Sequence, residues 1–212
     1  MKAYRTFLLL LAFGGVTFLS SAGQTPASVK TPASGNASGQ PVPQKITVHL
    51  DPAKTEIHWT VSTALHTVHG TFSLKGGLIT IDPSTGEAQG EVIVETASGQ
   101  SGNKSRDAKM QKEILESEKY PEAIFHPEKV TGSLRTGSQQ KISIGGLFTI
   151  HGGDHPLTLE MDIDMKGSDA TATTHFAVPY VQWGMKDPSS FFTHVSKEVK
   201  VDVAARGTVD GV

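Results

Sequence analysis

Apolar and polar residues alternate along most of the chain from Lys45 onward. A period of two places apolar side chains on one face of a strand and polar side chains on the other. The alternation is clearest in the segments 46–50, 57–61, 68–74, 92–94, 142–150, 157–165 and 199–203, where Thr, Ser, Glu, Lys or Asp fill the intervening positions. The pattern predicts an all-β fold of about eight antiparallel strands joined by short hairpins.

Turn residues and glycines distinguish a barrel from a sandwich. Turn chemistry separates the predicted strands at residues 51–52, 76–77, 82–86, 135–137 and 167–169. Many glycines also lie within or beside strands, where they mark bulges or sharp bends; they are Gly70, Gly76, Gly77, Gly90, Gly132, Gly145, Gly146, Gly152 and Gly153. Gly76 and Gly77 are predicted to form a hairpin turn. The other glycines favour a barrel, in which strands bend at corners.

One segment breaks the alternation, and its residues are typical of a short helix. It spans residues 103–118, and Met110, Ile114 and Leu115 form an apolar stripe at helical spacing. This stripe must be buried, either across one face of a sandwich or over the open end of a barrel. In a barrel, the helix is the first candidate for a lid.

The first 22 residues have the composition of a secretory signal peptide. Lys2 and Arg5 precede an apolar run from Phe7 to Leu19, and small residues follow, ending at Ala22. The run is shorter than the roughly 20 residues that span a bilayer, although an uncleaved anchor is the alternative. We therefore expect cleavage after Ala22 and a periplasmic or secreted protein, with no stable membrane insertion of the mature chain.

Composition divides the remaining chain into a linker and one domain. Residues 23–44 contain a single charged residue, Lys30, among Pro, Gly, Ser, Ala, Thr and Gln, which predicts a flexible linker. Residues 45–212 are long enough for one folded domain. The chain has 19 basic and 21 acidic residues and no cysteine. Disulfides, thiolate metal sites and a basic surface for nucleic acid are therefore not expected.

Five sequence elements together resemble a known family. They are 68–72 with its Gly-x-Phe pattern, 101–107 ending in Arg106-Asp107, 119–125 with Lys-Tyr-Pro-Glu-Ala-Ile-Phe, 146–152 with Gly-Leu-Phe-Thr-Ile-His-Gly, and 183–189 with Trp-Gly-Met-Lys-Asp-Pro-Ser. In this order they resemble the YceI-like family of periplasmic, polyisoprenoid-binding, lipocalin-like proteins. The similarity extends from Ile46 to about Gly207, and the polar, histidine-bearing segment 152–155 departs from the family pattern.

The resemblance implies an eight-stranded, lipocalin-like barrel with the helix near one end and a long isoprenoid or other amphiphilic lipid inside. The expected ligand-binding residues are apolar positions on strands and the helical stripe: Phe72, Val92, Val94, Met110, Ile114, Leu115, Phe125, Phe148, Ile150, Leu159 and Phe176. Such a protein stores or transports its ligand and needs neither a catalytic residue nor a cofactor. The sequence leaves the ligand's identity and the oligomeric state open.

Polar candidates for the rim of this site are Arg106, Asp107 and His151. Arg106 and Asp107 are also typical of an ion pair at a helix start, where Asp107 favours the positive end of the helix dipole. His151 and His155 flank a Gly-Gly turn and could approach one metal ion, but no third ligand has matching spacing, so no metal site is expected. Two other classes stay open: a secreted hydrolytic or metal-dependent enzyme, and an interaction module with a filled barrel.

Overall fold

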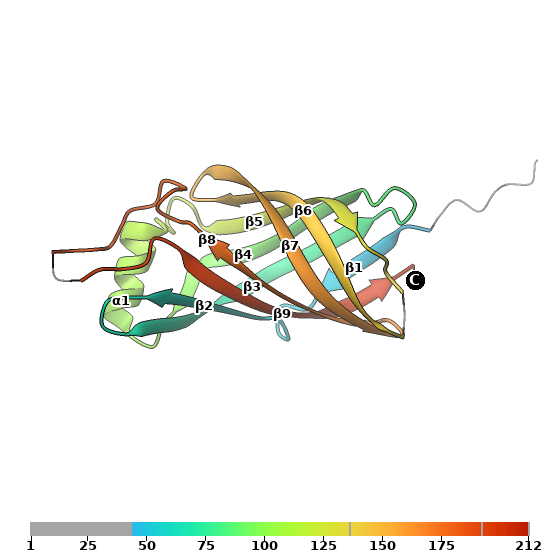
Figure 1. The fold of residues 1–212 in the computed structure, drawn as a ribbon, viewed down its shortest axis with the longest axis horizontal. Helices are drawn as coiled ribbons and strands as arrows, with labels where there is room; N and C mark the ends of the chain where they lie inside the picture. Colours follow the sequence, from blue (N-terminus) through green and yellow to red (C-terminus); the bar gives the residue numbers. More distant parts are fainter. Residues whose placement is uncertain (1–43, 136, 192, 212) are drawn as a thin grey trace, which may run out of the picture. The chain divides into compact units, whose positions relative to one another are not determined.

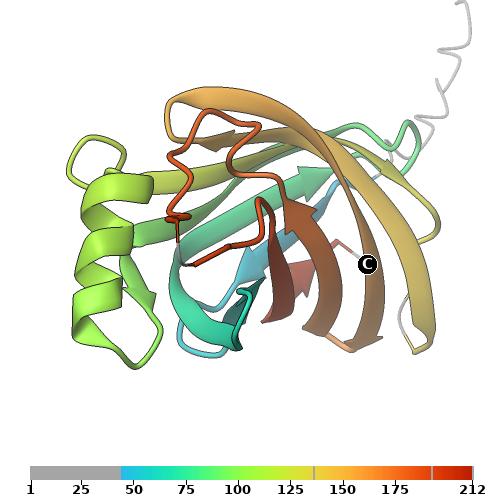
Figure 2. The ribbon, with the colours of Figure 1, turned by 60° about the vertical axis from the view of Figure 1, so that its left-hand side comes forward.

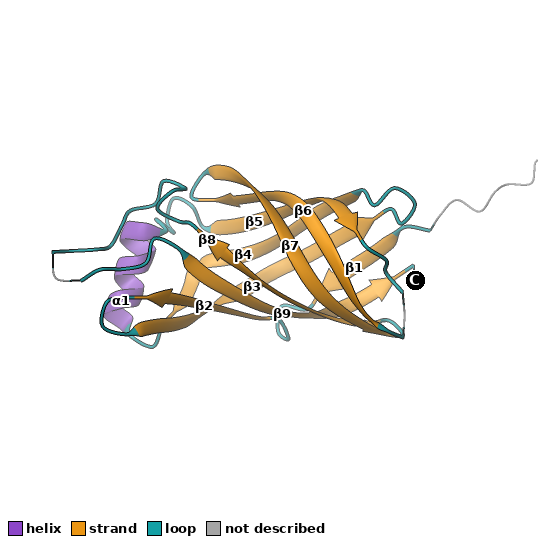
Figure 3. Cartoon of the chain, viewed as in Figure 1, coloured by secondary structure: helices purple, strands orange, loops and turns teal. Residues whose placement is uncertain are grey.

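The computed structural model describes residues 44–135, 137–191 and 193–211. The predicted signal peptide and the predicted linker up to residue 43 lie outside these ranges. The described elements are, in order, β1 (Ile46–Leu50), β2 (Glu56–Ser62), β3 (Thr67–Ile81), β4 (Ala88–Gln100), α1 (Lys104–Lys109), η1 (Met110–Ile114), β5 (Glu122–Thr131), β6 (Gln139–Ile150), β7 (Gly153–Lys166), β8 (Asp169–Val178) and β9 (Val199–Asp210). Strands make up most of this part of the chain (Figure 3).

The strands form a closed antiparallel barrel (Figure 1). Their order around it is β1-β3-β2-β9-β8-β7-β6-β5-β4, and the pairing of β3 with β4 closes the sheet. The strands β1 and β2 both pair with β3 on one side and β9 on the other, so they share one position of the barrel end to end. The nine strands therefore fill eight positions, which confirms the predicted eight-stranded barrel and excludes the sandwich.

A turn at residues 51–55 separates β1 from β2. The backbone amide of Thr55 donates to the carbonyl of Asp51 at 3.0 Å, and the Asp51 carboxylate accepts from the Ala53 amide at 3.0 Å. Arg206 of β9 bonds both ends of this turn, because its carbonyl accepts from the Asp51 amide at 2.8 Å and its amide donates to the Thr55 hydroxyl at 3.2 Å. The predicted Asp-Pro turn is thus correct, but it interrupts one barrel position instead of joining two neighbours.

Alternation along each strand decides which side chains face inward. In β7, for example, Leu157, Leu159 and Met161 face the barrel interior, whereas Thr158 and Glu160 between them are exposed. One cluster of buried apolar residues includes Ile46 at the start of β1 and Met165 near the end of β7, at one end of the barrel. A second cluster lies near the opposite end and includes the β8–β9 connection.

Two sequence interpretations are wrong in detail. Gly76 and Gly77 form no hairpin turn but lie inside β3, where the register with β4 shifts between Leu74 and Gly76. A hairpin at this point would end β3 early, whereas the chain continues as one long, bent strand to Ile81. The alternation also does not predict β5 or β8, although Phe125 and Phe176, which lie on these strands, are among the expected site residues.

The helix is the predicted short insert, but it is shorter than the predicted span of residues 103–118. Asn103 caps α1, because its side-chain oxygen accepts from the Arg106 amide at 3.1 Å. The helix continues as the π-helical turn η1 and ends before Glu116, which has a left-handed φ of 47°. Figure 2 shows the helix at the same end of the barrel as the long β8–β9 connection.

Candidate ligand-binding site

The barrel encloses an apolar cavity of about 430 Å³. Inward-facing side chains from all of the strands line it, together with residues of α1, η1 and the β8–β9 connection. Ligand pockets in proteins commonly have volumes of roughly 300–1,000 Å³, so this cavity has the size of a ligand site. An open interior of this size argues against the filled-barrel alternative.

All eleven residues expected to bind ligand line this cavity. They are Phe72, Val92, Val94, Met110, Ile114, Leu115, Phe125, Phe148, Ile150, Leu159 and Phe176. Of the three rim candidates, Arg106 lines the cavity, whereas Asp107 and His151 do not. The structure thus brings the apolar candidates together around one space, and their contact with a ligand stays a prediction.

Other lining residues were not among the expected site residues. Trp59 belongs to the apolar phase of β2, so the alternation of the sequence already marks it as inward-facing. Tyr180 and Met185 come from the β8–β9 connection, where no periodic pattern marks them as inward-facing. Both are buried in the second apolar cluster.

The two ends of the cavity differ. At the deep end Ile46, Ile81, Met165 and Val209 line the cavity and are all buried, and Met165 is only 2% exposed. At the helix end the lining includes the exposed Lys109 as well as polar or partly exposed residues of the β2–β3 hairpin and the β8–β9 connection. We therefore call the helix end the mouth. A chain-like molecule would enter there with its apolar end pointing to the deep end.

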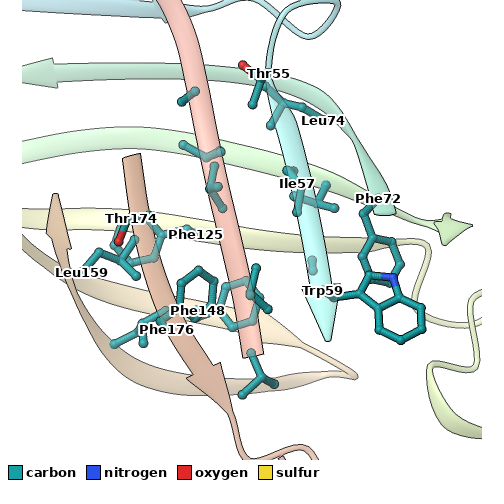
Figure 4. A pocket seen from close by; sticks show the side chains of 18 of the residues that line it. Thr55, Ile57, Trp59, Phe72, Leu74, Phe125, Phe148, Leu159, Thr174 and Phe176 are labelled. Atoms are coloured by element: carbon teal, nitrogen blue, oxygen red, sulfur yellow. The ribbon is translucent and has the colours of Figure 1, made fainter. Parts of the chain in front are cut away.

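Aromatic rings form two groups on the cavity wall (Figure 4). Phe148 contacts Phe176 edge to face at 6.4 Å between centroids. Phe148 also lies 6.0 Å from Trp183, which stacks on His155 at 4.1 Å, and neither Trp183 nor His155 lines the cavity itself. On other strands, Trp59 lies 6.3 Å from Phe72. These contacts fix the orientation of the rings and leave mainly apolar surface facing the cavity.

Arg106 and Asp107 are both held by Ser101 instead of by each other. The Arg106 guanidinium donates from Nε to the Ser101 hydroxyl at 2.7 Å and from Nη2 to its carbonyl at 2.9 Å. Asp107 accepts from the Ser101 amide at 2.9 Å and from the Ser101 hydroxyl. The expected ion pair at the helix start is therefore replaced by hydrogen bonds that join α1 to the end of β4.

The other rim candidate, His151, lies at the same end of the barrel and has a strained backbone conformation. The residues Glu116 and His151 both have left-handed backbone angles, with φ of 47° and 51°. The His151 Nε2 atom lies 3.6 Å from a carboxylate oxygen of Glu116, and its ring lies 4.6 Å from that of Tyr120. His155 instead stacks on Trp183, so the two histidines have different partners. Within the described ranges, no three His, Asp or Glu side chains gather closely enough to hold a metal ion.

An ion pair joins the β8–β9 connection to the helix. The Lys186 ammonium lies 2.6 Å from the Glu113 carboxylate and lowers the pKa of that carboxyl group below its ordinary value of 4.5. Tyr180, in the same connection, donates its hydroxyl to the Ser196 carbonyl at 2.9 Å. Burial, and secondarily the charge of Asp187, raises the pKa of Tyr180 to about 12, so this hydroxyl keeps its proton at neutral pH.

We expect the Lys186–Glu113 pair to make opening of the mouth sensitive to acid. Because the pKa of Glu113 is lowered in the folded protein, the pair stabilises the closed mouth above the ordinary carboxyl pKa, and this contribution is lost as the pH falls through the lowered value. Lys186→Gln should speed ligand exchange at neutral pH by about two- to threefold, since exposed pairs are weak. It should also reduce the acceleration that acid causes in the wild type.

The measurement is the rate at which a fluorescent fatty acid leaves the protein, followed between about pH 7 and pH 3. Lys75→Gln is the matched control, because Lys75 of β3 pairs with Glu122 of β5, so that this ion pair does not involve the β8–β9 connection. Equal exchange rates in the two variants would show that the Lys186 pair does not hold the mouth closed.

The fold and the cavity define a lipocalin-like β-barrel with an apolar interior cavity. Residues 49–206 match the YceI-like domain family, and the chain belongs to this family. A search of curated proteins found no match at a significant level.

Two solved structures have the same fold. BcnA of Burkholderia cenocepacia superposes with a TM-score of 0.61 at 18% identity, covering 74% of this chain and 98% of that protein. A polyisoprenoid-binding domain from Saccharophagus degradans, implicated in plant cell wall breakdown, has a TM-score of 0.59 at 14% identity and covers 77% of this chain and 98% of that domain. At these identities the similarity concerns the fold.

Proposed function

We propose that this protein holds the tail of an isoprenoid or similar amphiphilic lipid inside its barrel. The observation that carries the proposal is the apolar cavity of about 430 Å³, which is lined by buried apolar residues at its deep end and by Arg106 and Lys109 of the helix at its mouth. The Saccharophagus domain with the same fold is described as polyisoprenoid-binding, which supports the same class of ligand here. An apolar tail would occupy the cavity and leave a polar head near Arg106 and Lys109.

The energetics of burial suit this role. Moving an isoprene unit from water into an apolar interior gains roughly 3–4 kcal/mol before costs, at about 0.8 kcal/mol per carbon. After ordering costs, large ligands retain about 0.3 kcal/mol per heavy atom, which is about 1.5 kcal/mol per five-carbon unit. Each buried unit should therefore raise the affinity by about tenfold.

We further propose that the protein stores or carries this lipid through an aqueous compartment outside the cytoplasm. The supporting feature is the amino-terminal sequence, in which Lys2 and Arg5 precede the apolar run from Phe7 to Leu19. No helix in the described part of the chain is long and apolar enough to cross a membrane. A lipid with a long tail is nearly insoluble in water, so such a compartment requires a protein that shields it.

A series of prenols of increasing length tests the proposal. Delipidated protein is titrated with geraniol, farnesol and geranylgeraniol, and binding is followed by displacement of a fluorescent fatty acid. We expect the affinity to rise by about tenfold per isoprene unit until the cavity is filled. An affinity that does not change with chain length would contradict burial of the tail, even if all three prenols bound.

A further inference from the structure

The mouth of the barrel exposes large apolar side chains that the deep end does not. Three large hydrophobic residues are prominently exposed among the described residues: Leu65 at 81%, Phe191 at 96% and Leu78 at 44%. Leu65 lies in the β2–β3 hairpin and Phe191 in the β8–β9 connection, and both of these segments belong to the mouth. Leu78 lies within β3, on the outer wall of the barrel. Exposed apolar groups gathered at one place mark an interaction surface.

The two mouth segments are joined to each other. The Ala64 amide donates to the His194 carbonyl at 2.9 Å, and the Ser196 amide donates to the Ser62 carbonyl at 2.8 Å. Thr63 and Val195 also pair as an isolated bridge, and both line the cavity. The apolar residues Leu65 and Phe191 are therefore carried on one connected rim that borders the cavity opening.

Basic residues of the helix lie at the same end. Lys104, Lys109 and Lys112 are exposed, and Lys109 also lines the cavity. Of the neighbouring acidic residues, Glu118 is exposed, whereas Asp107 accepts hydrogen bonds from Ser101 and Glu113 pairs with Lys186.

Glu116 is engaged as well, because its carboxylate contacts His151. The lysine ammonium groups are thus left to face solvent beside the apolar rim. Apolar tips flanked by lysines are the chemistry that binds the interface of an anionic lipid bilayer.

We propose that this rim, defined by Leu65, Phe191, Lys104, Lys109 and Lys112, docks the mouth of the barrel onto the surface of an anionic lipid bilayer. The apolar tips enter the headgroup region and the lysines face anionic headgroups. Docking in this orientation places the cavity opening against the bilayer, so that a lipid tail can pass between membrane and barrel without crossing water. Vesicle binding is measured with lipid-free protein, so the result supports or rejects membrane docking independently of the proposed lipid binding.

Vesicle flotation tests the docking surface. Delipidated protein in its exported form is mixed with vesicles of phosphatidylcholine alone or of phosphatidylcholine with phosphatidylglycerol. We expect binding only when phosphatidylglycerol is present, and weaker binding as salt is added. Leu65→Ser and Phe191→Ser should each lower the vesicle partition coefficient by about tenfold, because each removes an apolar side chain from the interface.

Matched controls come from the same chain. Leu78→Ser removes an exposed leucine from the outer wall and should change the partition by less than about twofold. The triple variant Lys104→Gln, Lys109→Gln and Lys112→Gln should lose the dependence on phosphatidylglycerol. The same change at Lys45, Lys141 and Lys166, which are exposed near the deep end, should retain it. Melting temperatures confirm that the variants are folded.

Two results would overturn the proposal. The first is absence of vesicle binding by the wild type, or equal loss in Leu65→Ser and Leu78→Ser. The second is a dimer in solution that Leu65→Ser dissociates, which would assign the rim to a second copy of the chain. Uptake of prenols without vesicle binding would leave the proposed lipid binding intact and reject docking alone.

Discussion

Ala172→Trp should abolish the advantage of long lipid tails while leaving short tails bound. Ala172 is the fourth residue of β8, close to the turn at the deep end, and its side chain lines the cavity. An indole at this position would fill the deep half of the cavity. If this removes the space for about two isoprene units, geranylgeraniol should bind about 100-fold more weakly, whereas geraniol should bind with nearly unchanged affinity.

The same strand supplies the control. Ala177 is exposed on the outer face of β8, so Ala177→Trp adds the same side chain outside the barrel. It should bind every prenol as the wild type does. Unfolding of the lipid-free variants shows whether overpacking, which costs about 1–3 kcal/mol, has disturbed the barrel. Equal loss of geraniol and geranylgeraniol in a folded Ala172→Trp variant would contradict a cavity filled from its deep end.

Gly90→Ala should strongly destabilise the barrel at the place where β3 and β4 close it. Gly90 has a φ of 121°, which L side chains rarely adopt, and an added Cβ would lie 2.0 Å from the Leu78 carbonyl oxygen. The backbone must therefore move, and we expect a loss of about 3 kcal/mol or more in the free energy of unfolding. Urea denaturation of the lipid-free protein measures this change.

Gly76→Ala is the matched control, because Gly76 lies on β3 opposite β4 and an added Cβ would meet no atom within 4 Å. Its φ is not in the left-handed region. The stability should change by less than about 1 kcal/mol, and the substitution can even stabilise the protein by restricting the unfolded chain. Similar losses in both variants would show that the close approach at Gly90 is not what determines the effect.

The sequence identifies the barrel best where large apolar residues alternate without interruption, as in β6 and β7. It does not reveal β5, because Pro127 and a register shift between Pro127 and Lys129 break the alternation. It does not reveal β8 either, because Ala170 and Ala172 face inward but are too small to give a clear apolar signal. Small inward residues are nevertheless part of what leaves the interior open.

Pairing across strands accounts for the remaining errors. Gly76 and Gly77 have turn composition, but pairing with β4 keeps them in an extended strand. The joint position of β1 and β2 depends on Arg206, which is distant in sequence. In the site, the alternation and the helical stripe identify the wall and the helix side of the cavity. Tyr180 and Met185 reach it from an irregular connection, which no local pattern can predict.

If the barrel carries a lipid tail in its cavity, the lipid should stay with the protein through purification. Native mass spectrometry of the wild type and of Ala172→Trp, both purified from the native host and followed by lipid extraction, tests this expectation most directly. We predict a mass increment on the wild type that extraction identifies as a long-chain isoprenoid or similar amphiphile, and its loss or shortening in Ala172→Trp. A wild-type protein of bare polypeptide mass, or the same lipid in equal amount on both proteins, would contradict the account.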